Sequence, residues 1–251
     1  MKQNRNKQIV IDFYQKVIGE RDLHYAEKIV TENYIQHNPH VKTGKSGFLE
    51  AIAFLKKMPK PKKQEKPFMR IIADNAYVVV HLGVELGGQK KNVLDVFRIE
   101  DGLLAEHWDA IQDQSESNLN GNSEIEGPIL IENKEKTSFN KKIVKDFINQ
   151  VLVKRNFERT KDFIIEDLVQ HNPRVHNGIK GLIDSYKAIQ VLEVHRILGE
   201  GNFVVAQTKI KVQMKDAVSY DVFRLKEGWI VEHWNITQTI PDRMMHANGM
   251  L

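Results

Sequence analysis

The chain has 251 residues, of which 41% are hydrophobic and 28% are charged, a balance that fits a globular protein with a core and excludes disorder over the whole length. It contains no cysteine, so disulfides and thiolate chemistry are excluded and a reducing, cytoplasmic location is expected. Much of the net charge of +4 lies in the run KKMPKPKKQEK at residues 56–66. Because no aromatic residue interrupts that run, we expect a solvated loop and no nucleic-acid partner.

The first predicted elements are helices. The N-terminal stretch is amphipathic, and no segment of the chain approaches the roughly 18 apolar residues of a membrane span, so no membrane partner is expected. A second helix is predicted to begin near Asp22, a candidate N-cap, and a third to be capped by Ser46. The apolar residues at helical spacing in these three segments are Ile9, Val10, Phe13, Val17, Ala26, Ile29, Val30, Phe48, Leu49, Ile52 and Leu55.

Strands are predicted after residue 67. The segments FMRIIAD, AYVVVHLGVEL, NVLDVFRIE and LLAEHWDAIQ are short, rich in β-branched residues and separated by Gly or Asp. The pair Asp101-Gly102 between the last two segments is a strong hairpin signal. Three helices followed by an antiparallel meander give an α+β fold.

The same pattern occurs twice in the chain. Residues 6–55 align with residues 140–189 without a gap at an offset of 140 − 6 = 134, and residues 93–112 align with residues 219–238 at an offset of 219 − 93 = 126. The second copy therefore lacks 134 − 126 = 8 residues, and the basic loop is the natural place for the loss. We expect a first domain at residues 1–122, a linker at 123–137 and a second domain at 138–251. The segment 157–165 should be the counterpart of the second helix.

One predicted strand carries a pair of chemically capable side chains. Strand alternation places Leu103, Ala105, His107, Asp109 and Ile111 on one face, with Leu104, Glu106, Trp108 and Ala110 on the other. A carboxyl group held among apolar residues has a raised pKa and can transfer protons, and a nearby histidine can orient it or share its proton. Both residues also have common structural roles, as a hydrogen-bonded strand histidine and a turn-capping aspartate.

The sequence resembles the SnoaL-like proteins of the NTF2-like, cystatin-like superfamily. The resemblance rests on the segments YIQHNPHVKTGKSGF and DVFRIEDGLLAEHWDAIQ and on the Asn-Gly segments NLNGN and HANGML. It covers both copies and implies two tandem cone-shaped domains, each with N-terminal helices packed on a curved antiparallel sheet around a deep apolar pocket. Because the superfamily often dimerises through its sheets, it also implies an intramolecular pseudo-dimer, with room for higher oligomers.

The family's polyketide cyclases close rings by aldol condensation with an aspartate as general acid/base. The resemblance gives that role to Asp109, with His107 and His37 as further catalytic candidates in the same cavity and Asn38 and Asp95 as substrate-binding candidates. Such a reaction needs neither a metal nor an organic cofactor.

The second copy differs at the central position. Asn235 stands where the first copy has Asp109, and an amide cannot accept or donate the proton, whereas His171, His233 and Asp221 are kept. The second domain is thus expected to keep a binding site or a vestige of one. Because the run Gln-His-Asn-Pro survives in this copy, we interpret its Asn-Pro pairs as mainly structural, ending a strand at the pocket mouth.

Three functions remain open at this point. The chain is an enzyme that transfers protons on a small apolar carbonyl substrate, a protein that binds a small lipophilic ligand without chemistry, or, with weaker support, a metal protein that uses His37, His107 and Asp109.

Overall fold

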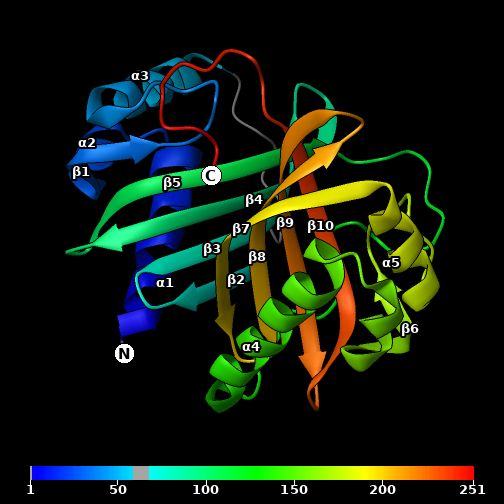
Figure 1. Ribbon diagram of the computed structural model, residues 1–251. Helices are drawn as coiled ribbons and strands as arrows, with labels where there is room; N and C mark the ends of the chain where they lie inside the picture. The colour runs from blue at the N-terminus through cyan, green and yellow to red at the C-terminus, as the bar shows by residue number, and fades with distance from the viewer. Residues whose placement is uncertain (1, 59–67) are drawn as a thin grey trace.

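The computed structural model describes residues 2–58 and 68–251 and contains two α+β domains, each with helices followed by a five-stranded sheet (Figure 1). Most of the basic run at residues 56–66 therefore lies outside the described residues, as does the predicted site of the eight-residue deletion. The elements of the first domain are α1 (Lys2–Asp12), the π-helix η1 (Phe13–Gly19), α2 (Leu23–Ile29), β1 (Val30–Gln36), α3 (Gly44–Lys57), β2 (Phe68–Asp74), β3 (Tyr77–Leu86), β4 (Gln89–Glu100) and β5 (Leu103–Asp113).

The second domain repeats this order. Its elements are the short 3₁₀-helix η2 (Lys134–Lys136), α4 (Thr137–Phe147), the π-helix η3 (Ile148–Val153), the 3₁₀-helix η4 (Phe157–Asp162), β6 (Ile164–Gln170), α5 (Gly178–Lys187), β7 (Ile189–Glu200), β8 (Phe203–Val212), β9 (Lys215–Lys226) and β10 (Trp229–Thr239). In both domains the last helix before the sheet is followed by three antiparallel hairpins, which confirms the α+β class and the duplication.

The sheets are mixed and not wholly antiparallel. Their strand orders are β1-β5-β4-β3-β2 and β6-β10-β9-β8-β7, and the edge strands β1 and β6 run parallel to β5 and β10. The strand expected to end at the Asn-Pro pair is present as β1, which ends at Gln36, but its parallel pairing with β5 was not predicted. Its start was also missed, because Val30 continues the apolar spacing of α2 although the helix ends at Ile29. The extra strand brings the run Gln-His-Asn-Pro beside β5.

The helix starts differ in detail from the predictions. Asp22 is the N-cap of α2, where its carboxylate accepts a hydrogen bond from the Tyr25 N–H at 3.0 Å. Ser46 does not cap α3, which already begins at Gly44 with Thr43 as N-cap. The predicted counterpart of α2 is the 3₁₀-helix η4, which ends at Asp162, before the segment becomes strand β6.

A β-bulge corrects part of the face assignment in β5. The register of β4 and β5 shifts between the pairs Arg98–Glu106 and Ile99–Leu104, leaving Ala105 as the extra residue. Leu104 therefore packs in the core of the first domain, and not with Trp108 on the opposite face as simple alternation predicted. Beyond the bulge the alternation is as predicted.

The described residues form three apolar cores. Each domain has a core between its helices and the inner face of its sheet, and a third core lies between the outer faces of the two sheets. In that third core Trp108 and Trp234 are both buried. The two domains thus pack sheet against sheet, with their helices on the far sides (Figure 1). Within residues 2–58 and 68–251 no helix is long and apolar enough to cross a membrane.

Candidate functional site

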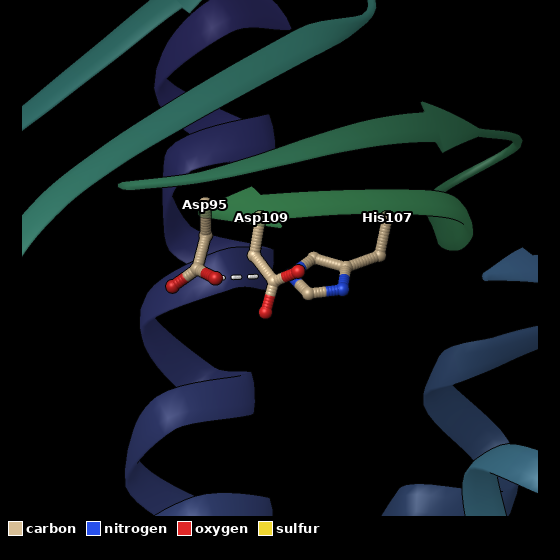
Figure 2. Close-up of side chains that lie close together, drawn as sticks. All are labelled: Asp95, His107 and Asp109. Atoms are coloured by element: carbon tan, nitrogen blue, oxygen red, sulfur yellow. Dashed lines mark hydrogen bonds and ion pairs between the residues drawn. The ribbon is translucent and has the colours of Figure 1, made fainter. Parts of the chain in front are cut away.

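The site is a cluster of Asp95, His107 and Asp109 on the inner face of the first sheet. Asp95 on β4 lies directly opposite Asp109 on β5, and His107 precedes Asp109 by two residues. Their three side chains project from the same face of the two strands, towards the N-terminal helices (Figure 2). One ligand atom of each residue lies within 4.8 Å of the others.

Asp109 is a buried carboxyl group that is only half satisfied by hydrogen bonds. Asn38 Nδ2 donates to Asp109 Oδ2 at 2.5 Å, whereas Oδ1 is buried without a hydrogen-bond partner among the described residues. Burial raises the pKa of Asp109 from 3.8 to about 6; the charge of Asp95 adds to the rise, and His107 and the Asn38 hydrogen bond oppose it. A carboxyl with this pKa changes charge near neutral pH.

His107 lies between two oxygen acceptors. Its Nε2 is 3.1 Å from Asp95 Oδ1 and its Nδ1 is 3.0 Å from Gln36 Oε1. The amide oxygen carries no hydrogen, so Nδ1 donates to it, and the carboxylate favours a second proton on Nε2. Burial lowers the pKa of His107, but the hydrogen bond and charge of Asp95 outweigh burial and raise it overall. The arrangement therefore favours an imidazolium, with Tyr14 Oη donating to the other oxygen of Asp95.

The second domain has the same framework without the second carboxyl. His233 Nε2 is 2.9 Å from Asp221 Oδ1, and Asn172 donates to Asn235 Oδ1 at 2.8 Å. The tyrosine that donates to Asp221 is Tyr186 of α5, at 2.7 Å, and not a residue of the π-helix as in the first domain.

The hydrogen bonds of the second histidine also differ. Gln170 places its Nε2, and not its oxygen, 3.0 Å from His233 Nδ1. That ring nitrogen accepts a hydrogen bond, so Nε2 carries the hydrogen that is donated to Asp221. In the first domain Gln36 Nε2 is 3.4 Å from Tyr34 Oη, a hydroxyl that the second domain lacks because Leu168 stands at that position.

A cavity of about 30 Å³ borders Asn172, Tyr186, His233 and Asn235. That volume suffices for one water molecule and not for an organic ligand. A larger surface hollow of about 390 Å³ lies around the start of α5, and none of the predicted site residues lines it.

His37 does not join the cluster. Its ring stacks on Trp108 with centroids 4.6 Å apart, and its Nε2 is 2.9 Å from Glu106, on the opposite face of β5 from Asp109. His171 repeats this placement against Trp234 and Glu232. The expectation that His37 lines the pocket is therefore wrong, because the residue that follows the end of β1 points towards the domain interface.

Three partners of the cluster were missed by the sequence reasoning: Tyr14, Tyr34 and Gln36. Gln36 is identical in both copies and adjoins a predicted residue, which was a usable signal. Tyr14 had no such signal, since Ile148 replaces it in the second copy and its position depends on how η1 packs on the sheet.

The cluster fits proton sharing better than metal binding. Two carboxylates and an imidazole form a reasonable donor set, but both ring nitrogens of His107 are already hydrogen-bonded to Gln36 and Asp95. The set His37, His107 and Asp109 is not assembled, since His37 lies on the other face of the sheet.

Comparison with known proteins points to one family. The family model described as SnoaL-like polyketide cyclase matches residues 8–116, which is most of the first domain. No curated protein matches the chain significantly.

The solved structures that resemble the chain each cover about one domain of it. An NTF2-like protein of unknown function from Cytophaga hutchinsonii is 20% identical, with a TM-score of 0.36, over 39% of this chain and 89% of its own. An LEH-like epoxide hydrolase from M. tuberculosis is 18% identical, with a TM-score of 0.35, over 41% of this chain and 85% of its own. An NTF-2 like protein of unknown function from Burkholderia xenovorans is 12% identical, with a TM-score of 0.39, over 47% of this chain and 91% of its own.

Proposed function

Since this chain belongs to the SnoaL-like family, with two copies of an NTF2-like fold in tandem, we propose that its first domain is an enzyme that transfers protons on a small apolar carbonyl compound. Asp109 is the general base. The reaction is of the aldol condensation, cyclisation or isomerisation type and uses no cofactor. The second domain supports the first and does not catalyse this reaction.

The observation that carries the proposal is the state of the Asp109 carboxyl. It is 5% exposed, its pKa is about 6, and one of its oxygens lacks a hydrogen-bond partner among the described residues while the other is held by Asn38. A buried acceptor without a partner costs about 1–3 kcal/mol, so it is a cost that a functional role explains. A base with a pKa near the working pH is also the most effective proton acceptor.

The proposed reaction begins with the carboxylate of Asp109. Oδ1 takes a proton from the carbon next to a substrate carbonyl, and the electron pair of the broken C–H bond moves into the carbonyl to give an enolate. In an aldol reaction this pair then attacks a second carbonyl carbon, and the resulting alkoxide takes the proton from Asp109, which regenerates the carboxylate. In an isomerisation Asp109 returns the proton to a different carbon.

The other members of the cluster have supporting roles. The imidazolium of His107 supplies the positive charge nearest to the base and lowers the energy of the developing enolate. Asp95 and Gln36 hold that ring in place through both of its nitrogens. Asn38 orients the carboxyl so that Oδ1 is the oxygen left for the substrate.

Deuterium exchange tests the proposal without knowledge of the natural substrate. The protein is incubated in D₂O with cyclic ketones of increasing size, and proton NMR follows loss of the signal from the carbon next to the carbonyl. The wild type should accelerate exchange, and Asp109→Asn should lose that acceleration by about 100-fold or more. Equal exchange by the two proteins above the buffer rate would contradict the assignment of Asp109.

Binding of a lipophilic ligand without chemistry is the competing function. It predicts that a ketone binds, is recovered unchanged, and shows no exchange above the buffer rate with either protein. A ketone that binds to both proteins and exchanges only with the wild type decides for the enzyme.

A further inference from the structure

The C-terminal segment of the second domain lies against the first domain, beside the loop that follows β1. In Figure 1 it passes over α3 and ends near β5. Its hydrogen bonds reach three backbone oxygens of the Gln-His-Asn-Pro run and one side chain beyond it. They are Met245 N to Pro39 O, His246 Nε2 to Asn38 O, and Asn248 Nδ2 to both Gln36 O and Thr43 Oγ1, all at 2.9 Å.

The segment NLNGN at residues 118–122, at the end of the first domain, makes the same contacts with the second domain. Leu119 N donates to Pro173 O at 2.8 Å, Asn120 Nδ2 to Asn172 O at 2.6 Å, and Asn122 Nδ2 to Gln170 O at 3.0 Å. These donors correspond to Met245, His246 and Asn248 at the offset of 126 that also relates the strands of the two copies. Each Asn-Gly segment thus crosses to the other domain, in a reciprocal exchange.

The exchange explains why the run Gln-His-Asn-Pro and the Asn-Gly segments are both duplicated. The loop after β1 has left the sheet, so its backbone oxygens need other donors, and the crossing segment supplies them. The histidines of the two runs complete the contact, because His37 Nδ1 donates to Gly249 O at 2.9 Å and His171 Nδ1 donates to Ser123 O at 2.5 Å.

The hydrogen bonds from the C-terminal segment form a clamp on the loop after β1, and two side chains at the start of that loop contact the site. Asn38, whose backbone oxygen is held by His246, donates its side-chain amide to Asp109. Gln36, whose backbone oxygen is held by Asn248, accepts the hydrogen bond from His107. We propose that His246 and Asn248 of the second domain are positioning residues for the Asp109 site of the first domain, so that this site is complete only when the C-terminal segment is docked.

The inference concerns the same site as the proposed function, but it can be tested without turnover. Without the clamp, Asn38 loses its fixed position and its hydrogen bond to the carboxylate weakens, so the carboxyl should keep its proton to higher pH. His40 lies on the same loop as Asn38 and also lowers the pKa of Asp109, so its displacement would shift the titration in the same direction. The other titratable groups around Asp109 lie on other elements and stay in place: Asp95, His107, Tyr14, Tyr34 and, across the domain interface, Tyr220.

The experiment compares two double variants of the full chain. His246→Ala/Asn248→Ala removes the clamp on the first domain, and Asn120→Ala/Asn122→Ala removes the equivalent clamp on the second. Carbon NMR of protein labelled at the aspartate carboxyl carbons follows the titration of Asp109, which the spectrum of Asp109→Asn identifies. Asn38→Ala shows how far the titration moves when the amide is removed altogether.

We expect the first variant to raise the titration midpoint of Asp109 by about one pH unit, the effect of losing one hydrogen bond to a carboxylate. The control variant should leave the midpoint unchanged while losing a similar amount of thermal stability. The single variant His246→Asn introduces the amide found at Asn120. With Asn248 intact, it should keep the wild-type titration midpoint of Asp109.

An unchanged titration midpoint of Asp109 in His246→Ala/Asn248→Ala overturns the inference. An equal change in both double variants also overturns it, because such a change would show that the structure loosens in general and not at the Asp109 site. If the double variant does not fold, Asn248→Ala alone is compared with Asn122→Ala by the same criteria. If this inference fails, the deuterium exchange catalysed by the wild type is unaffected. If the proposed function fails, deuterium exchange will not depend on Asp109.

Discussion

Asp109 and Asn235 occupy equivalent positions in the two sheets, and each accepts a hydrogen bond from the side-chain amide of an Asn-Pro pair. The second domain therefore accommodates an asparagine at the equivalent strand position. The first domain keeps a carboxyl there although burial disfavours its charged form. The proposed role of Asp109 as general base accounts for a carboxyl group at a position where its burial costs stability.

Asp109→Asn should therefore stabilise the protein while removing activity. The pKa of Asp109 in the folded protein, about 6, lies above its ordinary value of 3.8. The carboxyl group therefore lowers the free energy of unfolding increasingly as pH rises from about 4 to 6, and the full loss is present above that pH. The advantage of the variant in free energy of unfolding should grow by about 2–3 kcal/mol between pH 4 and pH 7. Urea unfolding at both pH values measures it, and a constant or shrinking advantage would contradict the account.

The reverse substitution in the second domain is the matched experiment. Asn235→Asp places a carboxyl near Asp221, so it should lower the urea midpoint at pH 8 more than at pH 5. Because the adjoining cavity is only about 30 Å³, the variant should add no ketone exchange to that of the first domain. Exchange that persists in Asp109→Asn/Asn235→Asp at the wild-type rate would show that the second domain can catalyse the reaction.

At the scale of the elements, two irregular features bring the site together. The π-helix η1 carries Tyr14, which donates to Asp95, and the bulge at Ala105 changes the alternation of β5 just before His107. Both are local departures from regular geometry of the kind that often occurs beside functional sites. Turn chemistry is regular by comparison: Asp101 and Gly102 both have positive φ, at 50° and 83°, as a two-residue hairpin of this type requires.

Two glycines between β5 and η2, Gly121 and Gly127, differ in what an added side chain would meet. Both have positive φ, but a Cβ at Gly121 would meet open space, whereas a Cβ at Gly127 would lie 2.8 Å from Trp234 Cζ2 and 3.2 Å from Arg70 Nη2. Gly121→Ala should cost about 1 kcal/mol of backbone strain. Gly127→Ala should cost about 2 kcal/mol more, because it also disturbs the stacking of Arg70 on Trp234. Equal urea midpoints for the two variants would contradict this packing.

The sequence predicted the elements better than their ends. Alternation and turn residues within each segment predict the hairpins, the strands β2 to β5 and the position of His107 and Asp109 on one face of the sheet. The parallel pairing of β1, the π-helices and the bulge depend on contacts between residues distant in sequence, so no local pattern predicts them. For the same reason Tyr14 and Gln36 were missed, and His37 was assigned to the wrong face.

At the scale of the whole molecule, the two domains form a pseudo-symmetric pair. Arg196 of the second domain lies 3.9 Å from the ring centre of Trp108, and Arg70 of the first lies 3.8 Å from that of Trp234. The two last strands also exchange bonds, from Ile111 N to Gln238 Oε1 at 2.8 Å and from Thr237 N to Gln112 Oε1 at 3.0 Å. The duplication was readable from the sequence, but these contacts were not, because each joins residues at least 196 − 108 = 88 positions apart.

This symmetry predicts the behaviour of the first domain alone. A protein of residues 1–127 keeps the outer sheet face with Trp108 and the segment 118–122 that docks on a Gln-His-Asn-Pro run, so two copies can reproduce the contacts of the two domains. Analytical ultracentrifugation should find a homodimer. A stable, well-folded monomer would contradict the account, because burial of the outer sheet face would then not be needed.

The pH dependence of deuterium exchange tests the central claim, that Asp109 is a base with a raised pKa. For a ketone whose exchange the wild type accelerates, the rate above the buffer rate is measured from pH 4 to pH 9. We expect it to rise through a midpoint near pH 6 as Asp109 ionises and to fall at higher pH as His107, whose pKa is also raised, loses its proton. A rate that is flat across this range, or that survives in Asp109→Asn with the same profile, would contradict the claim.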